Sequence, residues 1–156
     1  MEQPQLNEHN KQEFPPAHTA EHILNQTMVR MFGCERSRHT HIERKKSKLD
    51  YSLPTCPAAE QIAAIEQQVN EVIARHLPVT MEYMPQTEAV HLFDLGKLPD
   101  DASPTLRIVR IGDYDACPCI GTHVANTSEI GHFRISSTRY TDGIFRIVFR
   151  LDDTNL

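Results

Sequence analysis

Two pairs of side chains near opposite ends of the chain have the types and spacing of metal ligands. His18 and His22 stand four positions apart. In a helix residues four apart differ by only about 40° around the axis, so both rings can reach one ion. Cys119 and His123 repeat this separation with a thiol and a third imidazole. Such a nitrogen and sulfur set favours zinc, provided that the fold brings the two pairs together.

Each pair alone has a simpler interpretation. A histidine pair at this spacing is commonly solvated or satisfied by neighbours, and free cysteines such as Cys119 are commonly buried in cores. Both pairs in one short chain predict a metal site. Glu21 lies beside the histidines, at a spacing that does not complete the ligand set. We therefore expect this carboxylate to take part in chemistry rather than to bind the metal.

Length and composition indicate one domain with its own core. The chain has 156 residues, of which 39% are hydrophobic, and a formal net charge of -5. No apolar run approaches the roughly 18 to 20 residues that span a bilayer, and the polar first residues do not resemble a signal peptide. We therefore expect a cytoplasmic protein, with residues 1–16 as an N-terminal arm and residues 17–156 as the zinc-binding domain.

The first half of the chain has helical periodicity. Apolar residues repeat at helical spacing from Ala17 to about Met31, and again over about 58–76. Between the two helices, residues 35–48 concentrate six basic side chains. Such a segment is commonly a solvated loop or hairpin, and it also suits phosphate backbones.

The second half of the chain has short β-type runs instead. They fall at residues 79–84, 89–93, 106–111, 132–139 and 144–151. A Thr-Asp-Gly turn at 141–143 predicts a hairpin between the last two runs. Helices early and antiparallel strands late predict an α+β fold, with two or three helices packed on an antiparallel sheet.

At this point the sequence resembles a known family. The histidine pair, the segment IEQQVNEVIARHLPV and especially CIGTHVANTSEIGHFRI are similar to the editing domain shared by alanyl- and threonyl-tRNA synthetases, and to the free-standing alanyl-tRNA deacylases. The likeness runs from about His18 to Leu151. It implies an α+β fold, hydrolysis of a mischarged aminoacyl-tRNA in trans, and a zinc ion held by the four ligand candidates, which are His18, His22, Cys119 and His123.

Departures from the family pattern surround the expected pocket. CIGTH, preceded by Cys117-Pro118, replaces the common CGGTH, and Glu21 stands where a threonine is frequent. Residues 38–41, RHTH, replace a segment that usually carries a glutamine and a Gly-Ser pair. We predict Glu21 as the proton-transferring residue. The predicted substrate-binding residues are polar side chains near these motifs, namely Thr19, Arg38, His39, His41 and Thr122.

The predicted substrate is Ser-tRNA(Ala), with Gly-tRNA(Ala) as a second candidate. Four protein ligands would close a tetrahedral zinc, whereas catalytic sites usually keep one position open. A non-catalytic, zinc-stabilised domain that binds tRNA or a synthetase is therefore the alternative. The string HTAEH also fits an inverted zincin, but that class needs an acidic third ligand and a larger chamber. The oligomeric state is open.

Overall fold

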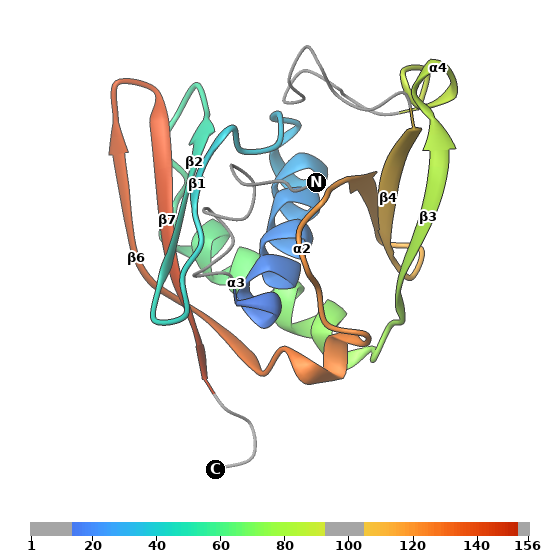
Figure 1. Ribbon diagram of the computed structural model, residues 1–156. Coiled ribbons are helices and arrows are strands. Elements are labelled where there is room, and N and C mark those ends of the chain that lie inside the picture. The colour runs from blue at the N-terminus through green and yellow to red at the C-terminus, as the bar shows by residue number, and fades with distance from the viewer. Residues whose placement is uncertain (1–13, 93–104, 153–156) are drawn as a thin grey trace.

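The computed structural model describes residues 14–92 and 105–152. Figure 1 shows α2 between two sheets, with α3 next to it. The elements follow in the order α2 (Pro15–Phe32), β1 (His39–His41), β2 (Ser47–Ser52), α3 (Ala59–Ala74), β3 (Val79–Pro85), α4 (Gln86–Ala89), β4 (Thr105–Ile111), β5 (Asp115–Pro118), η1 (Thr127–Glu129), β6 (His132–Thr141) and β7 (Ile144–Asp152). This is the predicted α+β class, with helices packed on antiparallel strands.

The central helix, α2, begins two residues before the expected Ala17. Pro15 and Pro16 occupy its first positions, where a missing N–H is harmless because these groups have no partner within a helix. The helix ends at Gly33, which has a φ of 68° and donates its N–H to the Val29 carbonyl at 2.9 Å. Glycine adopts this left-handed conformation without steric cost. The predicted arm of residues 1–16 lies mostly outside the described residues.

The four-stranded sheet has the order β1-β2-β7-β6 and is antiparallel throughout. Side chains alternate across it, as period-two strands require. Leu49, Tyr51, Phe145, Ile147 and Phe149 point inward and are buried against the helices. The predicted hairpin between the last two strands is confirmed, and Asp142 and Gly143 provide the positive φ values of its turn.

The second helix, α3, packs beside α2 and protects the edge strand β6. The side-chain amide of Asn70 donates to the carbonyl of Phe133 and accepts from its N–H, both at 2.8 Å. The Ile135 N–H donates to a Glu66 carboxylate oxygen at 2.8 Å. These contacts satisfy backbone groups that an open sheet edge leaves unpaired.

The second sheet, with the order β3-β4-β5, carries the cysteine segment to α2. The Tyr114 hydroxyl, just before β5, lies 2.7 Å from the Thr27 hydroxyl of α2. The Arg30 guanidinium donates to the Tyr114 carbonyl at 2.8 Å. The C-terminal half of the chain is thereby fixed against the same helix that carries the histidines.

Two expectations about the strands were wrong. The run 89–93 was expected to be a strand, but α4 and a turn occupy residues 86–92, and Phe93 lies outside the described residues. Pro85 precedes this turn, and short apolar runs do not distinguish a strand from a helical turn. The strands also form two sheets rather than one, and β5 was not expected at all because only four residues define it.

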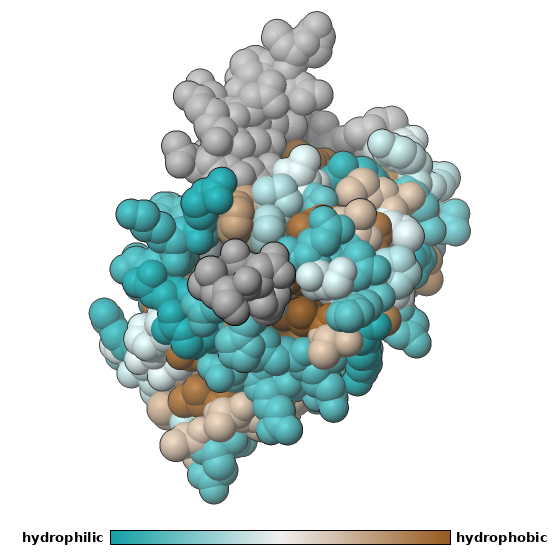
Figure 2. All heavy atoms as spheres, turned by 90° about the horizontal axis from the view of Figure 1, so that it is seen from below, coloured by the Kyte–Doolittle hydropathy of each residue, from teal (hydrophilic) through white to brown (hydrophobic). Residues whose placement is uncertain are grey.

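The face of the molecule seen from below is mainly polar (Figure 2). Figure 2 shows a mostly hydrophilic surface from below, with apolar side chains in small separate patches. The large apolar side chains are instead gathered between the layers. Among the described residues, no helix is both long and apolar enough to cross a membrane.

Candidate metal centre

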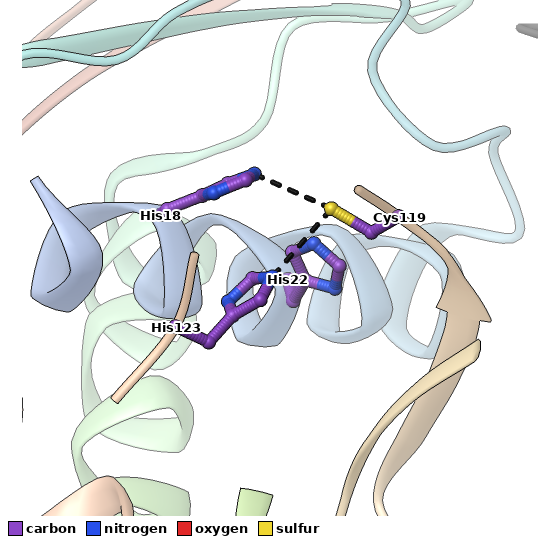
Figure 3. A group of neighbouring side chains, drawn as sticks. All are labelled: His18, His22, Cys119 and His123. Carbon is purple, nitrogen blue, oxygen red and sulfur yellow. Dashed lines mark hydrogen bonds between the residues drawn. The ribbon is translucent and has the colours of Figure 1, made fainter. Parts of the chain in front are cut away.

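The four side chains predicted as metal ligands come together between α2 and the loop after β5 (Figure 3). His18 and His22 project from α2, and Cys119 and His123 from the loop. One potential ligand atom of each lies within 4.8 Å of those of the other three. The Cys119 sulfur lies 3.6 Å from His18 Nε2 and 3.5 Å from His123 Nε2. These four residues are called the His/Cys cluster below.

Arg107 of β4 gives the loop its shape. Its Nε donates to the Cys119 carbonyl at 2.9 Å, and its Nη2 donates to the Gly121 carbonyl. The Cys119 N–H donates back to the Arg107 carbonyl at 3.0 Å. The Gly121 N–H points at the Cys119 sulfur from 3.4 Å, a contact that stabilises a thiolate. The loop is therefore built to direct the sulfur toward α2.

The Thr19 hydroxyl determines which nitrogen of His123 carries the proton. This hydroxyl is buried and donates its only hydrogen to the Pro15 carbonyl at 2.9 Å. It accepts from the Val124 N–H at 3.2 Å and lies 3.0 Å from His123 Nδ1. Because its hydrogen is already used, His123 Nδ1 must be the donor. The lone pair of the ring is then on Nε2, which faces Cys119.

His18 is oriented by a similar contact. Its Nδ1 lies 3.3 Å from the carbonyl oxygen of Thr122, and a carbonyl can only accept. The proton therefore lies on Nδ1 and the lone pair on Nε2, which again faces Cys119.

His22 connects the His/Cys cluster to a buried group of charges. Its Nδ1 lies 3.2 Å from the Cys117 sulfur and 3.6 Å from a carboxylate oxygen of Asp115, which leaves Nε2 for the cluster. The Arg36 guanidinium forms a two-pronged ion pair with Asp115, at 2.7 and 3.2 Å. A carboxylate behind a ligating histidine fixes the ring and raises its basicity.

Electrostatics favour a thiolate in the cluster. Burial alone raises the pKa of Cys119, but hydrogen bonds from His123, His18 and His22 outweigh it and lower this pKa to about 2. Burial, together with the charges of His22 and His18, lowers the pKa of His123 to about 4, so this ring is neutral at pH 7. For Cys119 and His123, a thiolate and a neutral imidazole are the protonation states that metal binding requires. Burial lowers the pKa of His18, but the hydrogen bond and charge of Cys119 outweigh it and raise this pKa.

The Asp115 carboxylate is charged in spite of its burial. Burial raises its pKa, but the hydrogen bond of His22 and the charge of Arg36 hold that pKa well below its usual range. The same network, led by Cys117, overcomes burial and raises the pKa of His22 well above its usual value. The negative charge of Asp115 beside Nδ1 therefore favours a proton on this imidazole.

Glu21 lies at the edge of the cluster. It is buried on α2, and one carboxylate oxygen lies 3.6 Å from His18 Nε2, the nitrogen that faces Cys119. It does not join the four residues whose potential ligand atoms are mutually close. Its role as the proton-transferring group stays a prediction.

The predicted substrate-binding residues fall into three places. Thr19 is buried inside the cluster, where its hydroxyl serves three protein groups. Thr122 is exposed next to His123 in the same loop. Arg38, His39 and His41 line a shallow, open hollow of about 520 Å³ on the outer face of the four-stranded sheet, away from α2. The structure does not bring these last three residues to the cluster.

Sequence reasoning missed three residues that build this centre. Arg36 was counted in the basic segment suited to phosphate, yet its guanidinium is turned inward to Asp115. Asp115 and Arg107 were not identified at all. Strand alternation could have found Asp115, because Asp115, Cys117 and Cys119 are alternate residues, but the four residues of β5 carry too little pattern to predict that strand.

Comparison with known proteins identifies the class to which this architecture is related. Residues 106–148 match the family described as the threonyl and alanyl tRNA synthetase second additional domain. This segment includes β4, β5, the ligand loop and most of the C-terminal hairpin. The expected resemblance to the synthetase editing domain is thereby confirmed, and the likeness to free-standing deacylases stays a prediction.

Most of the chain is similar to a region of alanine–tRNA ligases. It is 31% identical over 156 residues to the enzyme of Methanococcus vannielii, a match that covers 93% of this chain and 17% of that protein. The enzyme of Hyperthermus butylicus is 36% identical over 136 residues, covering 83% of this chain and 14% of the relative. The enzyme of Methanothrix thermoacetophila is 36% identical over 140 residues, a match that covers 85% of this chain and 15% of that protein. The chain thus spans about one sixth of the length of these relatives.

Proposed function

We propose that His18, His22, Cys119 and His123 hold a zinc ion. Bond lengths of about 2.3 Å for Zn–S and 2.0 to 2.1 Å for Zn–N place sulfur and nitrogen about 3.6 Å apart around a tetrahedral ion. The separations of 3.6 and 3.5 Å between the Cys119 sulfur and the nitrogens of His18 and His123 fit this value. The observation that carries the proposal is that each imidazole places Nδ1 against a protein acceptor and leaves Nε2 for the thiolate side.

The function that this centre supports best is hydrolysis of the ester bond of a mischarged aminoacyl-tRNA. The match to the synthetase domain and to alanine–tRNA ligases supports a tRNA substrate, and the His/Cys cluster supports a metal-dependent hydrolase. A zinc ion at this site would polarise the ester carbonyl or lower the pKa of a nearby water. Hydrolysis would then release the amino acid and leave the tRNA intact.

Within this proposal, Glu21 handles the proton. Its carboxylate lies beside the cluster, with one oxygen 3.6 Å from His18 Nε2, the nitrogen that would bind the zinc. It would take a proton from the attacking water and pass it to the ribose oxygen that leaves. Thr19 has a different role, because its hydroxyl acts through His123.

The orienting role of Thr19 makes a quantitative prediction. Thr19→Val removes the acceptor that holds the proton on His123 Nδ1, and loss of such a partner typically lowers metal affinity 10- to 100-fold. Competition with a chromogenic zinc chelator measures this change.

Thr27→Val is the matched control. Thr27 is also a buried threonine of α2, and its hydroxyl contacts the Ile23 carbonyl and Tyr114 rather than a ligand. It should weaken the fold without weakening zinc binding. Equal losses of zinc affinity in both variants would contradict the orienting role.

We propose serine on tRNA(Ala) as the group that is removed. Alanine is smaller than serine, so a pocket that accepts serine cannot exclude alanine by size. Discrimination must use a polar group that pairs with the serine hydroxyl, an effect that can reach about 10⁴ to 10⁵ in selectivity. Thr122 is exposed in the ligand loop and is the proposed polar group. Gly-tRNA(Ala) stays a second candidate, although glycine has no hydroxyl for such a contact.

A panel of mischarged tRNAs tests this specificity. The purified protein should hydrolyse Ser-tRNA(Ala) far faster than Ala-tRNA(Ala), with Gly-tRNA(Ala) and a threonyl ester included for comparison. Thr122→Val should reduce the ratio of the hydrolysis rates of the seryl and alanyl esters. Equal wild-type rates on these two esters would overturn the proposed specificity.

The number of ligands favours one alternative function. Four protein side chains can close a tetrahedral zinc, as in structural sites. The chain would then be a zinc-stabilised domain that binds tRNA or a synthetase without catalysis. In that case zinc removal would unfold the protein, and the purified zinc form would bind mischarged tRNA without consuming it.

A further inference from the structure

The outer face of the four-stranded sheet is strongly basic in a chain whose formal net charge is -5. Register and alternation place five cationic side chains on it against two carboxylates, Asp50 and Asp152. The five are Lys48 of β2, Arg134 and Arg139 of β6, and Arg146 and Arg150 of β7. We call these residues the basic face. It lies on the side of the sheet turned away from α2, since the alternate residues of the same strands are packed in the core.

The four arginines of the basic face form two like-charged pairs across β6 and β7. Arg139 stands opposite Arg146, and Arg134 stands opposite Arg150. Like charges directly opposite one another destabilise a sheet. The two carboxylates of this face each pair with one arginine of a pair, and an anionic ligand that lies over both pairs would compensate the charge of the other arginine.

The carboxylates of the face neutralise only part of this charge. Arg146 pairs with Asp50 at 2.8 Å, and Arg134 pairs with Asp152 at 3.0 Å. Within the part of the chain that the structure describes, no carboxylate pairs with Arg139. Arg150 donates to the Lys45 carbonyl at 3.3 Å rather than to an acid. Three positive charges, of Lys48, Arg139 and Arg150, remain for a ligand.

The spacing of the pairs indicates a long ligand. Arg146 and Arg150 are four residues apart on β7, or about 13 Å at 3.3 Å per residue. A single phosphate ion cannot contact both arginine pairs, but a nucleic-acid backbone with successive phosphate groups can. Arginine suits this role because its planar fork matches phosphate oxygens.

The face also indicates which part of a nucleic acid it contacts. The aromatic side chains of these strands lie elsewhere: Tyr51, Phe145 and Phe149 are buried, and the Tyr140 hydroxyl donates to the Leu53 carbonyl. Single-stranded bases are recognised mainly by stacking on aromatic rings. The rings of His39 and His41 belong to the edge strand, whereas the basic face itself carries no phenylalanine, tyrosine or tryptophan ring and fits the sugar-phosphate backbone of a duplex.

The edge segment that lines the hollow on this face is close in sequence to Arg36, which lies beside the His/Cys cluster. The hollow is lined by Arg38, His39 and His41 of the edge segment, together with Lys48 and Arg146. Arg36, two residues before Arg38, contacts the Cys117 sulfur at 3.3 Å beside the cluster. The edge strand β1 therefore links the basic face to the metal centre.

We propose that the basic face binds the phosphate backbone of an RNA duplex, which for the proposed function is the acceptor stem of the substrate tRNA. The proposal rests on the proposed function only for the identity of this RNA. Arg38, His39 and His41, predicted from the sequence to face substrate, contact the body of the RNA in this arrangement rather than its aminoacyl group.

Binding of an uncharged RNA hairpin tests the proposal. The probe carries the acceptor stem and CCA end of tRNA(Ala), and fluorescence anisotropy gives its affinity at several salt concentrations. Each phosphate contact contributes about 0.9 to the slope of log affinity against log salt. Arg139→Gln should therefore lower affinity roughly five- to tenfold at about 0.1 M salt and reduce the slope by about one. The double variant R139Q/R150Q should reduce the slope by about two.

Arg110→Gln is the matched control. Arg110 is an exposed strand arginine of the other sheet, paired with Glu82 at 3.0 Å. Its replacement removes the same charge and should leave RNA affinity nearly unchanged. Thermal unfolding of Arg139→Gln should occur at the wild-type temperature or higher, because one like-charged pair is removed.

The outcomes separate this proposal from the proposed function. Unchanged RNA affinity and salt dependence in the basic-face variants would overturn the proposal that this face binds RNA. An equal loss of RNA affinity in Arg110→Gln would also overturn it, because the binding would then depend on total charge alone. Binding to phosphatidylserine vesicles without binding to the hairpin would also overturn it, in favour of a membrane surface. A seryl ester of a short CCA oligonucleotide cannot span the face, so its hydrolysis should be equal in all variants. If the wild-type protein hydrolyses neither that ester nor Ser-tRNA(Ala), the proposed function fails, while the hairpin affinities still test the basic face.

Discussion

Replacement of Cys119 by alanine is expected to remove the zinc and to slow hydrolysis of Ser-tRNA(Ala) by roughly 10³-fold or more. Cys119 supplies the only sulfur of the His/Cys cluster, and it lies within 3.6 Å of both His18 and His123. Metal ions typically contribute several kcal/mol to such reactions, and each 1.36 kcal/mol is a factor of ten in rate. Elemental analysis gives the zinc content, and initial rates give the loss of activity. His22→Ala should behave in the same way.

Two other cysteines provide controls for this change. Cys34 is half-buried, and its sulfur contacts the Met28 carbonyl at 3.6 Å rather than the cluster, so Cys34→Ala should keep zinc and activity. Cys117 contacts His22 at Nδ1, on the side of the ring away from the proposed zinc ligand Nε2, so Cys117→Ala should retain one zinc per chain with Asp115 still behind the ring. Full zinc occupancy in both Cys119→Ala and His22→Ala would show that the ion is bound elsewhere.

Glu21→Gln should keep the zinc and lose roughly 10²-fold or more in hydrolysis, the usual contribution of a general base. Glutamine has nearly the same shape but cannot accept the proton. The Glu21 carboxylate lies beside His18 without completing the ligand set, so its loss should not release the metal. Single-turnover rates together with zinc analysis separate the two effects.

Glu71→Gln is the control for this substitution. Glu71 is an exposed residue of α3 that pairs with Arg75 at 3.6 Å. Its replacement should change neither zinc content nor rate. If Glu21→Gln also hydrolyses the ester at the wild-type rate, Glu21 is a structural carboxylate of α2 and another group transfers the proton.

Strong periodicity made much of the fold predictable. The apolar repeats of α2 and α3 and the alternation of Phe145, Ile147 and Phe149 each identify one buried face, and the turn at 141–143 joins the last two strands as expected. Sheet membership was not predictable, because the pairing of β3, β4 and β5 apart from the other strands depends on contacts far apart in sequence. The four-residue β5 and the turn after Pro85 carry too little pattern to decide their structure.

The candidate site was predictable where spacing alone defines it. His18 with His22, and Cys119 with His123, share a separation that the structure converts into one cluster. The groups behind these ligands were not predictable, because their roles arise only in three dimensions. Arg36 belongs by sequence to a basic surface segment, yet its charge is turned inward to Asp115. Arg38, His39 and His41 lie close to α2 along the chain, but β1 carries them to the outer face of the sheet.

The central claim is that this chain uses a zinc ion at the His/Cys cluster to hydrolyse a mischarged tRNA. The most direct test is multiple-turnover hydrolysis of Ser-tRNA(Ala) by the purified protein, before zinc removal by a chelator, after removal, and after addition of one equivalent of zinc. The account predicts that the zinc-loaded protein consumes a large molar excess of ester, that removal stops turnover, and that one equivalent restores it. Failure of the zinc-loaded protein to turn over, or undiminished turnover after complete zinc removal, would contradict the account.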